Sequence, residues 1–299
     1  MKRWSEIVPT LARAQPIGKY TAARIGGPAD YLFVADSGTS DATLIDVFTA
    51  ALGAGVPVRV IGGGANILVS DAGVRGLVIV NRAGGIVWEE DGCVQVRAGT
   101  GLLALARAAA ARGWRGFEWA VGVPGTVGGA VVNNAGAHGS DMAASLVEAV
   151  IVRADGALET WPKARFAFDY RTSALKQAAD PLLVLSARLH FDADDPAAVQ
   201  ARMSEYTAHR RRTQPSGASL GSVFKNPPGD YAGRLIEACG LKGCTIGTAQ
   251  VSTVHANFFL SDGQTRAADY RALIELVQAE VERRFGVLLE PEIQFVGEW

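Results

Sequence analysis

The chain lacks the features that define several protein classes. It has only three cysteines in 299 residues, Cys93, Cys239 and Cys244, and no CxxC pair, which argues against a disulfide framework or a zinc site. The four histidines also lack metal-ligand spacing, so we expect no metal. A formal net charge of -1 does not indicate the excess of positive charge that is typical of nucleic-acid-binding proteins.

Long apolar runs are also missing. No stretch is apolar enough to span a bilayer, and no signal-peptide core follows the start Met1-Lys2-Arg3. We therefore expect a soluble, cytoplasmic protein with no membrane association and no obligate protein partner. Its binding partner is expected to be a small molecule.

The length and the hydrophobic content of 48% suffice for two compact domains. The texture of the sequence changes at residues 192–196, where Asp195 can cap a helix and Pro196 suits its first turn. We place the domain boundary here, with a cofactor domain at residues 1–192 and a substrate-binding domain at residues 193–299. Helices and short strands are mixed in both, which indicates an α+β fold class.

The hydrophobic pattern and the positions of glycine, proline and capping residues predict two sets of helices and strands. In the cofactor domain we expect strands at residues 56–61, 78–80, 85–90, 93–98, 146–153 and 182–191, with a hairpin turn at Asp91-Gly92 and a helix at 102–112. In the substrate domain we expect helices at residues 196–212, 231–239 and 267–285, and a strand at 257–260.

Two glycine-rich segments, residues 62–67 and 122–130, are suited to a close approach between backbone and a phosphate group. Consecutive glycines leave room for an anion and allow the positive φ angles that aim amide N–H groups at it. Neither segment matches a named nucleotide motif, because Ile67 ends the first and no Lys-Ser/Thr pair follows. Tight turns in a sheet-rich domain are the alternative.

A third segment, residues 221–234, places a hydroxyl, an ammonium and an amide in a loop stiffened by glycine and proline, just before a helix. A loop of this kind positions side chains for chemistry.

These segments occur with others in a specific order along the chain. The ordered motifs are Arg24 to Ala29, Ile61 to Asp71, Glu118 to Gly139, Tyr170 to Ser173, Gln214-Pro215, Gly221 to Arg234, Val251-Ser252, His255 to Phe258, and Pro291 to Ile293. In this order the sequence resembles the family of UDP-N-acetylenolpyruvoylglucosamine reductases, the flavoenzymes also called UDP-N-acetylmuramate dehydrogenases. The stretch between Arg171 and Ser222 is short, so the chain is similar to the family's compact form.

The resemblance implies a two-part FAD-binding domain of the vanillyl-alcohol-oxidase (PCMH-type) superfamily and a smaller α+β substrate-binding domain. It also implies NADPH as reductant, a UDP-sugar enolpyruvyl ether as substrate, and a place in peptidoglycan precursor synthesis. Ala65 stands where covalently flavinylated relatives often carry histidine, so we expect noncovalent FAD. The cofactor-binding residues implied are Arg24, Gly62, Gly63, Gly64, Ala65, Asn66, Ile67, Gly122, Pro124, Gly125, Thr126, Gly128, Gly129 and Ala130.

By the same resemblance, three residues carry the chemistry. Arg171 would hold and polarise the enolpyruvyl carboxylate, because a guanidinium is a planar, permanent cation; the alternative is a structural ion pair. Ser222 would give the proton to the second carbon, with a backbone-capping hydroxyl as the alternative. Glu292 would stabilise the enol form if burial raises its pKa; otherwise it is a surface glutamate at a strand end.

Substrate contacts are expected from Tyr170, Gln214, Lys225 and Asn226, and His255 is expected to be structural. Residues 210–212 form a cationic turn that faces a diphosphate or ends a solvated helix. Two rival functions remain: a flavin oxidase of the same superfamily, and a catalytically silent UDP-sugar-binding protein.

Overall fold

A computed structural model of the chain describes residues 2–299, and the chain forms two compact units. Unit 1 comprises the N-terminal residues up to Arg13 together with Tyr31–Gly63 and Gly76–His209. Unit 2 comprises Ala14–Asp30, Gly64–Arg75 and Arg210–Trp299. Both units are therefore built from segments that are separate in sequence. The expected division of functions at residues 192 and 193 stays a prediction, because compactness alone does not test which part binds which ligand.

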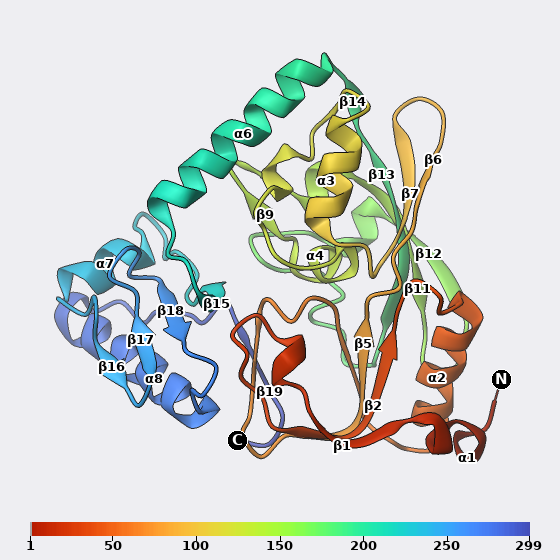
Figure 1. The fold of residues 1–299 in the computed structure, drawn as a ribbon, viewed down its shortest axis with the longest axis horizontal. Helices are drawn as coiled ribbons and strands as arrows, with labels where there is room; N and C mark the ends of the chain where they lie inside the picture. Colours follow the sequence, from red (N-terminus) through yellow and green to blue (C-terminus); the bar gives the residue numbers. More distant parts are fainter. Residues whose placement is uncertain (1) are drawn as a thin grey trace. The chain divides into compact units, whose positions relative to one another are not determined.

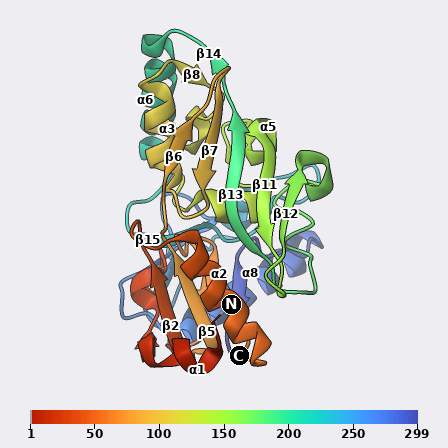
Figure 2. The ribbon, with the colours of Figure 1, turned by 90° about the vertical axis from the view of Figure 1, so that its right-hand side faces the viewer.

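Unit 1 is organised around a five-stranded antiparallel sheet, which Figure 2 shows with β7, β13, β11 and β12 side by side. The strand order is β12-β11-β13-β7-β6. The bounds are β6 Ile86–Trp88, β7 Cys93–Arg97, β11 Leu146–Val152, β12 Leu158–Pro162 and β13 Leu183–His190. Valine, isoleucine and leucine dominate these strands, as a pleated and half-buried surface favours.

The β6–β7 hairpin confirms the turn expected at Asp91-Gly92. Asp91 has φ 56° and Gly92 has φ 75°, the left-handed values that a tight hairpin turn needs at both central residues. A Cβ on Gly92 would lie 2.1 Å from the carbonyl oxygen of Phe191, so the turn also requires a residue without a side chain.

Two helices pack on this sheet. They are α3 Leu102–Ala110 and α4 Val127–Asn133, and their buried leucine, alanine and valine side chains join the inward-facing residues of β7, β11 and β13 in one core cluster. The expected helix at residues 102–112 is thus confirmed to within two residues. Short elements complete the region: β8 Trp114–Arg115, η3 Glu118–Ala120, β9 Gly136–Ala137, β10 Ser140–Asp141, α5 Met142–Ser145, η4 Lys163–Phe166 and β14 Asp192–Ala193.

A second core cluster of unit 1 lies around helix α2 Asp41–Gly53. Ser40 caps this helix by accepting a hydrogen bond from the amide of Thr43. Helix α2 packs near β3 Val58–Ile61, which runs parallel to β5 Val74–Asn81. Helix α2 was not among the elements expected from the sequence. The remaining elements near the N-terminus are α1 Trp4–Ile7, η1 Val8–Thr10, β1 Ala12–Pro16, η2 Gly18–Tyr20 and β2 Pro28–Ala35.

Unit 2 is a small α+β unit with a four-stranded antiparallel sheet of order β15-β18-β17-β16. Figure 1 shows α7 and α8 beside these strands. The bounds are β15 Ala218–Ser222, α7 Ala232–Ala238, β16 Thr245–Ile246, β17 Ala249–Val251, β18 Phe258–Ser261 and α8 Ala267–Phe285. A parallel pair, β4 Ile67–Val69 and β19 Gln294–Val296, also belongs to this unit.

Helix α8 is the main packing partner of this sheet. Its start is capped by Asp71, whose carboxylate accepts the amides of Ala267 at 2.8 Å and Ala268 at 3.0 Å. Its end is marked by Gly286 in the left-handed region at φ 68°. Buried Tyr270 donates to the carbonyl of Phe259 at 3.1 Å, and burial raises the pKa of its phenol. The expected helix at 267–285 is confirmed.

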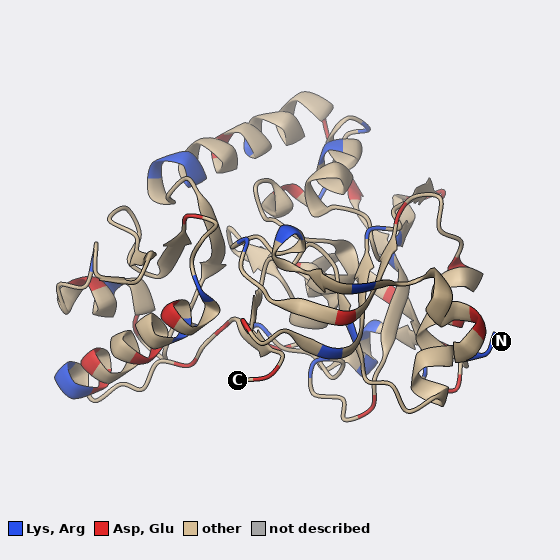
Figure 3. Ribbon diagram, turned by 60° about the horizontal axis from the view of Figure 1, so that its bottom comes forward, with Lys and Arg blue, Asp and Glu red and all other residues tan. Residues whose placement is uncertain are grey.

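Helix α6 Pro196–Thr213 carries the chain from unit 1 into unit 2. The amide of Ala197 donates to the Asp195 carboxylate at 3.3 Å, which confirms the start expected from Asp195-Pro196. Figure 3 shows basic and acidic residues interspersed along the ribbon. Over residues 2–299, no helix is both long and apolar enough to cross a membrane.

A substitution at Gly64 tests whether the triple glycine is required for packing. A Cβ at this residue would lie 2.2 Å from the carbonyl oxygen of Tyr20, and its φ is +60°. We expect Gly64→Ala to destabilise the protein by about 1–3 kcal/mol through overpacking. Gly53→Ala is the matched control, because a Cβ there meets nothing within 4 Å and alanine favours the helix. Urea unfolding would measure both, and equal stability of the two variants would contradict the packing argument.

Candidate active site

Ser222 lies at the end of β15, where the strand leaves regular pairing. The register between β15 and β18 shifts between Ser219 and Ser222, and Gly221 takes the left-handed φ of 75°. Ser222 then pairs with Phe258. Irregularities of this kind re-aim a side chain at the end of a strand, and Ser222 lines a pocket of unit 2.

Asn257 fixes the loop that follows Ser222. Its side-chain oxygen accepts the amide of Phe224 at 2.9 Å, and its side-chain nitrogen donates to the carbonyl of the same residue at 2.8 Å. Its own carbonyl accepts the amide of Val223 at 2.8 Å. Asn257 is only 3% exposed, so these bonds are made away from water and are strong. Residues 223 and 224 are therefore held rigidly against the turn that contains Asn257.

Glu292 belongs to the same hydrogen-bonded frame. Its amide donates to the carbonyl of Val223 at 2.8 Å, directly beside Ser222 in sequence. Its carbonyl accepts the side-chain nitrogen of Asn66 at 3.1 Å. Unit 2 thus brings together the backbone segments of two residues that are 70 positions apart in the chain.

Two expected substrate contacts already have structural partners. The Lys225 ammonium lies 2.6 Å from a carboxylate oxygen of Glu290, and an ammonium keeps further N–H donors beyond that ion pair. The side-chain oxygen of Asn226 accepts a hydrogen bond from the backbone N–H of Ala232 at 3.1 Å, at the start of α7. The side-chain NH₂ of Asn226 is therefore the group able to contact a ligand. Gln214 lies just after α6, with its amide bonded to the carbonyl of Arg210 at 2.8 Å.

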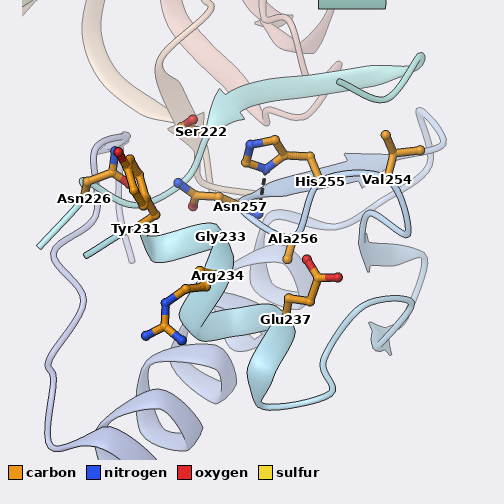
Figure 4. Close-up of a pocket in the computed structure, with 10 residues that line it drawn as sticks. All are labelled: Ser222, Asn226, Tyr231, Gly233, Arg234, Glu237, Val254, His255, Ala256 and Asn257. Atoms are coloured by element: carbon orange, nitrogen blue, oxygen red, sulfur yellow. Dashed lines mark hydrogen bonds between the residues drawn. The ribbon is translucent and has the colours of Figure 1, made fainter. Parts of the chain in front are cut away.

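The pocket that Ser222 lines has a volume of about 450 Å³ and is drawn in Figure 4. It is formed by the end of β15, the start of α7 and the turn between β17 and β18. Its lining residues are Ser222, Asn226, Tyr231, Gly233, Arg234, Glu237, Val254, His255, Ala256 and Asn257. On this wall, the Tyr231 side chain is 69% exposed.

In unit 1, Arg171 lies at the tip of a tight turn formed by residues 169–172. Asp169 and Thr172 pair across the turn, and Arg171 takes the left-handed φ of 58°. Its guanidinium donates to the carbonyl of Gly136 at 2.9 Å. A left-handed arginine costs backbone energy, and such residues cluster at functional sites. Tyr170, its neighbour, is 49% exposed, with its ring centroid 5.4 Å from the guanidinium carbon.

Asn134 anchors this turn and was missed by the sequence analysis. Its side-chain nitrogen donates to the Asp141 carboxylate at 3.0 Å and to the carbonyl of Asp169 at 3.1 Å. Its side-chain oxygen accepts the amide of Ala143 at 3.0 Å. Asn134 ends α4 in the left-handed region at φ 43°. Asparagine tolerates this conformation, so its position at the end of a glycine-rich helix was a usable signal.

The glycine loop offers backbone donors for an anion. The amides of residues 63 to 66, four in succession, donate to no acceptor among the described residues 2–299. Gly64 lies against Tyr20 and Thr21, and its carbonyl accepts the amide of Ala22 at 3.0 Å. The loop is thus fixed by packing while its N–H groups remain available. Such a row of amides is the chemistry that a pyrophosphate needs.

The second glycine segment fits the same ligand chemistry. Gly125 has φ 127°, a Cβ there would meet only Leu102 at 3.9 Å, and its amide has no acceptor among the described residues. Within unit 1, a Cβ on Gly63 would lie 2.8 Å from the Cα of Gly125, so the two glycine segments touch backbone to backbone. Thr126 caps α4 by accepting the amide of Gly129 at 3.5 Å.

Trp119 adds an unsatisfied buried donor in unit 1. The residue is 2% exposed, and its indole nitrogen has no hydrogen-bond partner among residues 2–299. A buried donor without an acceptor is rare in a native protein and calls for an explanation. Within unit 1, the Gly125 backbone and this indole donor are both suited to a bound polar group. Arg24 is exposed in unit 2 and has φ 58°.

Arg210 is a half-buried cation near the end of α6. It makes no ion pair among the residues described, and burial lowers the pKa of its guanidinium. Its neighbours Arg211 and Arg212 are exposed. Of these three arginines, Arg210 is thus the one that is partly removed from water without an ion pair among the described residues.

Two protein-family models match parts of the chain. Residues 213–296 match the family described as UDP-N-acetylenolpyruvoylglucosamine reductase, C-terminal domain. Residues 37–161 match the family described as FAD binding domain. The first match covers the segments of Ser222, His255 and Glu292, and the second covers both glycine segments.

Relatives align with almost the whole chain. UDP-N-acetylenolpyruvoylglucosamine reductase of Chloroflexus aggregans is 42% identical over 96% of this chain and 98% of its own length. The protein of that name from Synechococcus elongatus is 43% identical over 98% of this chain and 97% of its own length. The crystal structure of the Thermus caldophilus enzyme has a TM-score of 0.81 and 34% identity, and covers 96% of this chain and 98% of that chain. The expected fold class and the FAD cofactor are confirmed.

The burial of His255 generates a pH prediction. Burial, with a further effect of the Lys242 ammonium, lowers the pKa of this imidazole, so the folded protein favours its neutral form. Stability is therefore lost as pH falls below the ordinary histidine value of about 6.5, and the loss is complete below the folded-state pKa. We expect His255→Gln to reduce the acid-induced fall in melting temperature. Identical pH profiles for the two proteins would contradict this assignment.

Proposed function

Since the chain belongs to the family of UDP-N-acetylenolpyruvoylglucosamine reductases, we propose that it reduces UDP-N-acetylglucosamine enolpyruvate to UDP-N-acetylmuramate with NADPH as reductant. This would place it in peptidoglycan precursor synthesis, in the cytoplasm, acting without an obligate protein partner. The structural observation that carries the proposal is the frame of Val223, Asn257 and Glu292, which sets Ser222 on the wall of a pocket.

The cofactor would be held largely by backbone. The four free amides of residues 63 to 66 and the amide of Gly125 are the donors suited to the FAD pyrophosphate. Arg24, Ile67, Gly122, Pro124, Thr126, Gly128, Gly129 and Ala130 are proposed as the surrounding contacts. FAD held there and reduced by NADPH would supply a hydride to the substrate. The protein must then manage the charge and the proton.

Reduction of an enolpyruvyl ether adds a hydride to the terminal carbon and a proton to the adjacent carbon. As the hydride adds, negative charge spreads onto the carboxylate. The Arg171 guanidinium would bind that carboxylate and stabilise the charge, because a fixed cation costs no reorganisation during reaction. The Glu292 carboxyl would assist the enol form by hydrogen bonding.

Ser222 would supply the proton. A serine hydroxyl is a weak acid and can act only toward a strongly basic carbon centre placed beside it. The rigid bonds of Asn257 to residues 223 and 224 favour such fixed placement. The Lys225 ammonium keeps N–H donors beyond its ion pair with Glu290, and one of them would stabilise the resulting alkoxide by hydrogen bonding.

The diphosphate of the substrate would meet Arg210. A half-buried guanidinium without an ion-pair partner among residues 2–299 gains a counter-ion when an anion binds, whereas exposed Arg211 and Arg212 would gain less. Tyr170, Gln214 and the side-chain NH₂ of Asn226 are proposed as further substrate contacts. We also propose the division into a cofactor domain at residues 1–192 and a substrate-binding domain at residues 193–299. Its support from the compact units is that Ser222 and Glu292 both lie in unit 2.

A spectroscopic titration tests the proposed reaction. Purified protein should be yellow, should bleach with NADPH in the absence of oxygen, and should regain colour on addition of UDP-N-acetylglucosamine enolpyruvate. Rapid recovery with oxygen but not with the enolpyruvyl substrate would instead indicate a flavin oxidase. Protein that binds the nucleotide sugar but cannot bind FAD would indicate a silent UDP-sugar-binding protein.

The role of Ser222 can be tested against a neighbour in the same strand. Ser222→Ala should still bleach with NADPH, while colour recovery with the enolpyruvyl substrate should slow by about 10²–10⁴-fold, the usual contribution of a general acid. Ser219→Ala is the control, since Ser219 lies in β15 but does not line the pocket. Normal colour recovery in Ser222→Ala would show that another group donates the proton.

A further inference from the structure

His255 faces the same pocket as Ser222, although the proposed mechanism gives it no role. It lies in the turn between β17 and β18, and both residues line the pocket of about 450 Å³. Figure 4 shows the imidazole turned so that the ring nitrogen not bonded to Asn257 is on the side nearer Ser222.

The hydrogen bonding of His255 defines which ring nitrogen carries the proton. Nδ1 accepts the backbone amide of Asn257 at 3.2 Å. A nitrogen that accepts a hydrogen bond bears no proton, so the neutral ring must carry its proton on Nε2. Burial favours this neutral form by lowering the imidazole pKa. The imidazole therefore offers the pocket one neutral N–H donor.

This donor is held in place from several sides. The hydroxyl of Ser252 accepts the amides of Val254 at 3.1 Å and His255 at 3.3 Å, which fixes the turn. The ring packs against Phe258 with a centroid distance of 4.9 Å. On the α7 side, Gly233 leaves just enough room, since a Cβ there would lie 3.1 Å from the ring carbon Cε1. A donor so constrained loses little entropy when it binds a ligand.

The charges around the pocket favour a neutral acceptor. Arg234 is bonded to Asp230, and this bond lowers the pKa of the Asp230 carboxyl to about 2. The Lys242 ammonium lies 2.7 Å from Glu237, so this cation is paired as well. With its bordering cations neutralised, the wall near His255 offers an anion little attraction. A neutral N–H suits a hydroxyl or amide oxygen.

The chemistry of the proposed substrate puts such oxygens beside Ser222. The carbon that Ser222 would protonate is joined to the hexosamine ring through a single ether oxygen, so the sugar must lie next to this serine. Resting on the proposed function, we propose that His255 is a substrate-binding residue whose Nε2–H donates to a hydroxyl or acetamido oxygen of the N-acetylhexosamine.

Two substitutions separate this role from a purely structural one. In His255→Gln the side-chain nitrogen reaches the place of Nε2 and can still donate into the pocket. In His255→Asn the side-chain oxygen reaches the place of Nδ1 and can still accept the Asn257 amide, but nothing donates to the sugar. Both variants should be made as FAD-loaded proteins, with the KM of the enolpyruvyl substrate and the Kd of UDP-N-acetylmuramate as readouts.

We expect His255→Asn to raise KM and Kd by about tenfold, the loss of one neutral hydrogen bond, and His255→Gln to stay within about threefold of the parent. The reverse order would show that the bond to Asn257 is what matters, and would overturn the proposal. Equal values in the two variants, whether normal or impaired, would overturn it as well.

The NADPH half-reaction keeps this test distinct from that of the proposed function. Bleaching by NADPH should be equal in the parent and both variants, because His255 is assigned to the sugar and not to the cofactor. If the parent protein bleaches but never regains colour with the enolpyruvyl substrate, the proposed reaction is wrong. If the parent recovers and the variants do not differ in KM and Kd, only the His255 assignment fails.

Discussion

The two hydrogen bonds between the Asn257 side chain and the backbone of Phe224 are the constraint on which unit 2 depends. They occupy both the donor and the acceptor of a buried residue, and leaving either group unpaired would cost about 1–3 kcal/mol. Through them, the loop after Ser222 and the turn of His255 become one rigid body. The bond from Glu292 to Val223 extends this body to the last strand. A residue that contacts no reacting atom thus sets the geometry of those that would.

Glycine serves packing and ligand chemistry at different positions of the same loop. Gly64 is required because backbone of Tyr20 and Thr21 lies where a side chain would be. That packing holds residues 63 to 66 in a conformation whose amides find no acceptor among the described residues. The sequence interpretation linked these glycines to a phosphate directly. The structure adds that the protein's own backbone fills part of the space that the missing side chains leave.

Local signals in the sequence were sufficient for much of the fold. The Asp91-Gly92 hairpin, helix α3, helix α8 with its final Gly286, and the start of α6 all follow from turn and capping chemistry that acts within a few residues. Helix α2 was not predicted, although Ser40 is a residue type that favours a helix N-cap. The two compact units could not be read from local patterns, since each is assembled from three separate segments.

The candidate site was predictable to a different degree at each residue. The order of motifs singled out Ser222 and Glu292, and the backbone of Glu292 bonds to Val223, the residue after Ser222. Motifs did not reveal that Asn226 caps α7 or that Lys225 pairs with Glu290, because these partners depend on how the chain folds back. Asn134 and the protonation state of His255 likewise emerge only from hydrogen bonds across segments. Such bonds have no signature in a single stretch of sequence.

The most direct test of the proposed chemistry is a crystal structure of the FAD-loaded protein with UDP-N-acetylmuramate bound. It should show the Arg171 guanidinium on the lactyl carboxylate and the Ser222 hydroxyl oxygen about 3–3.5 Å from the adjacent carbon, as a reacting pair requires. If Arg171 and Ser222 instead contact different parts of the ligand, or none of it, the division of roles between them is wrong.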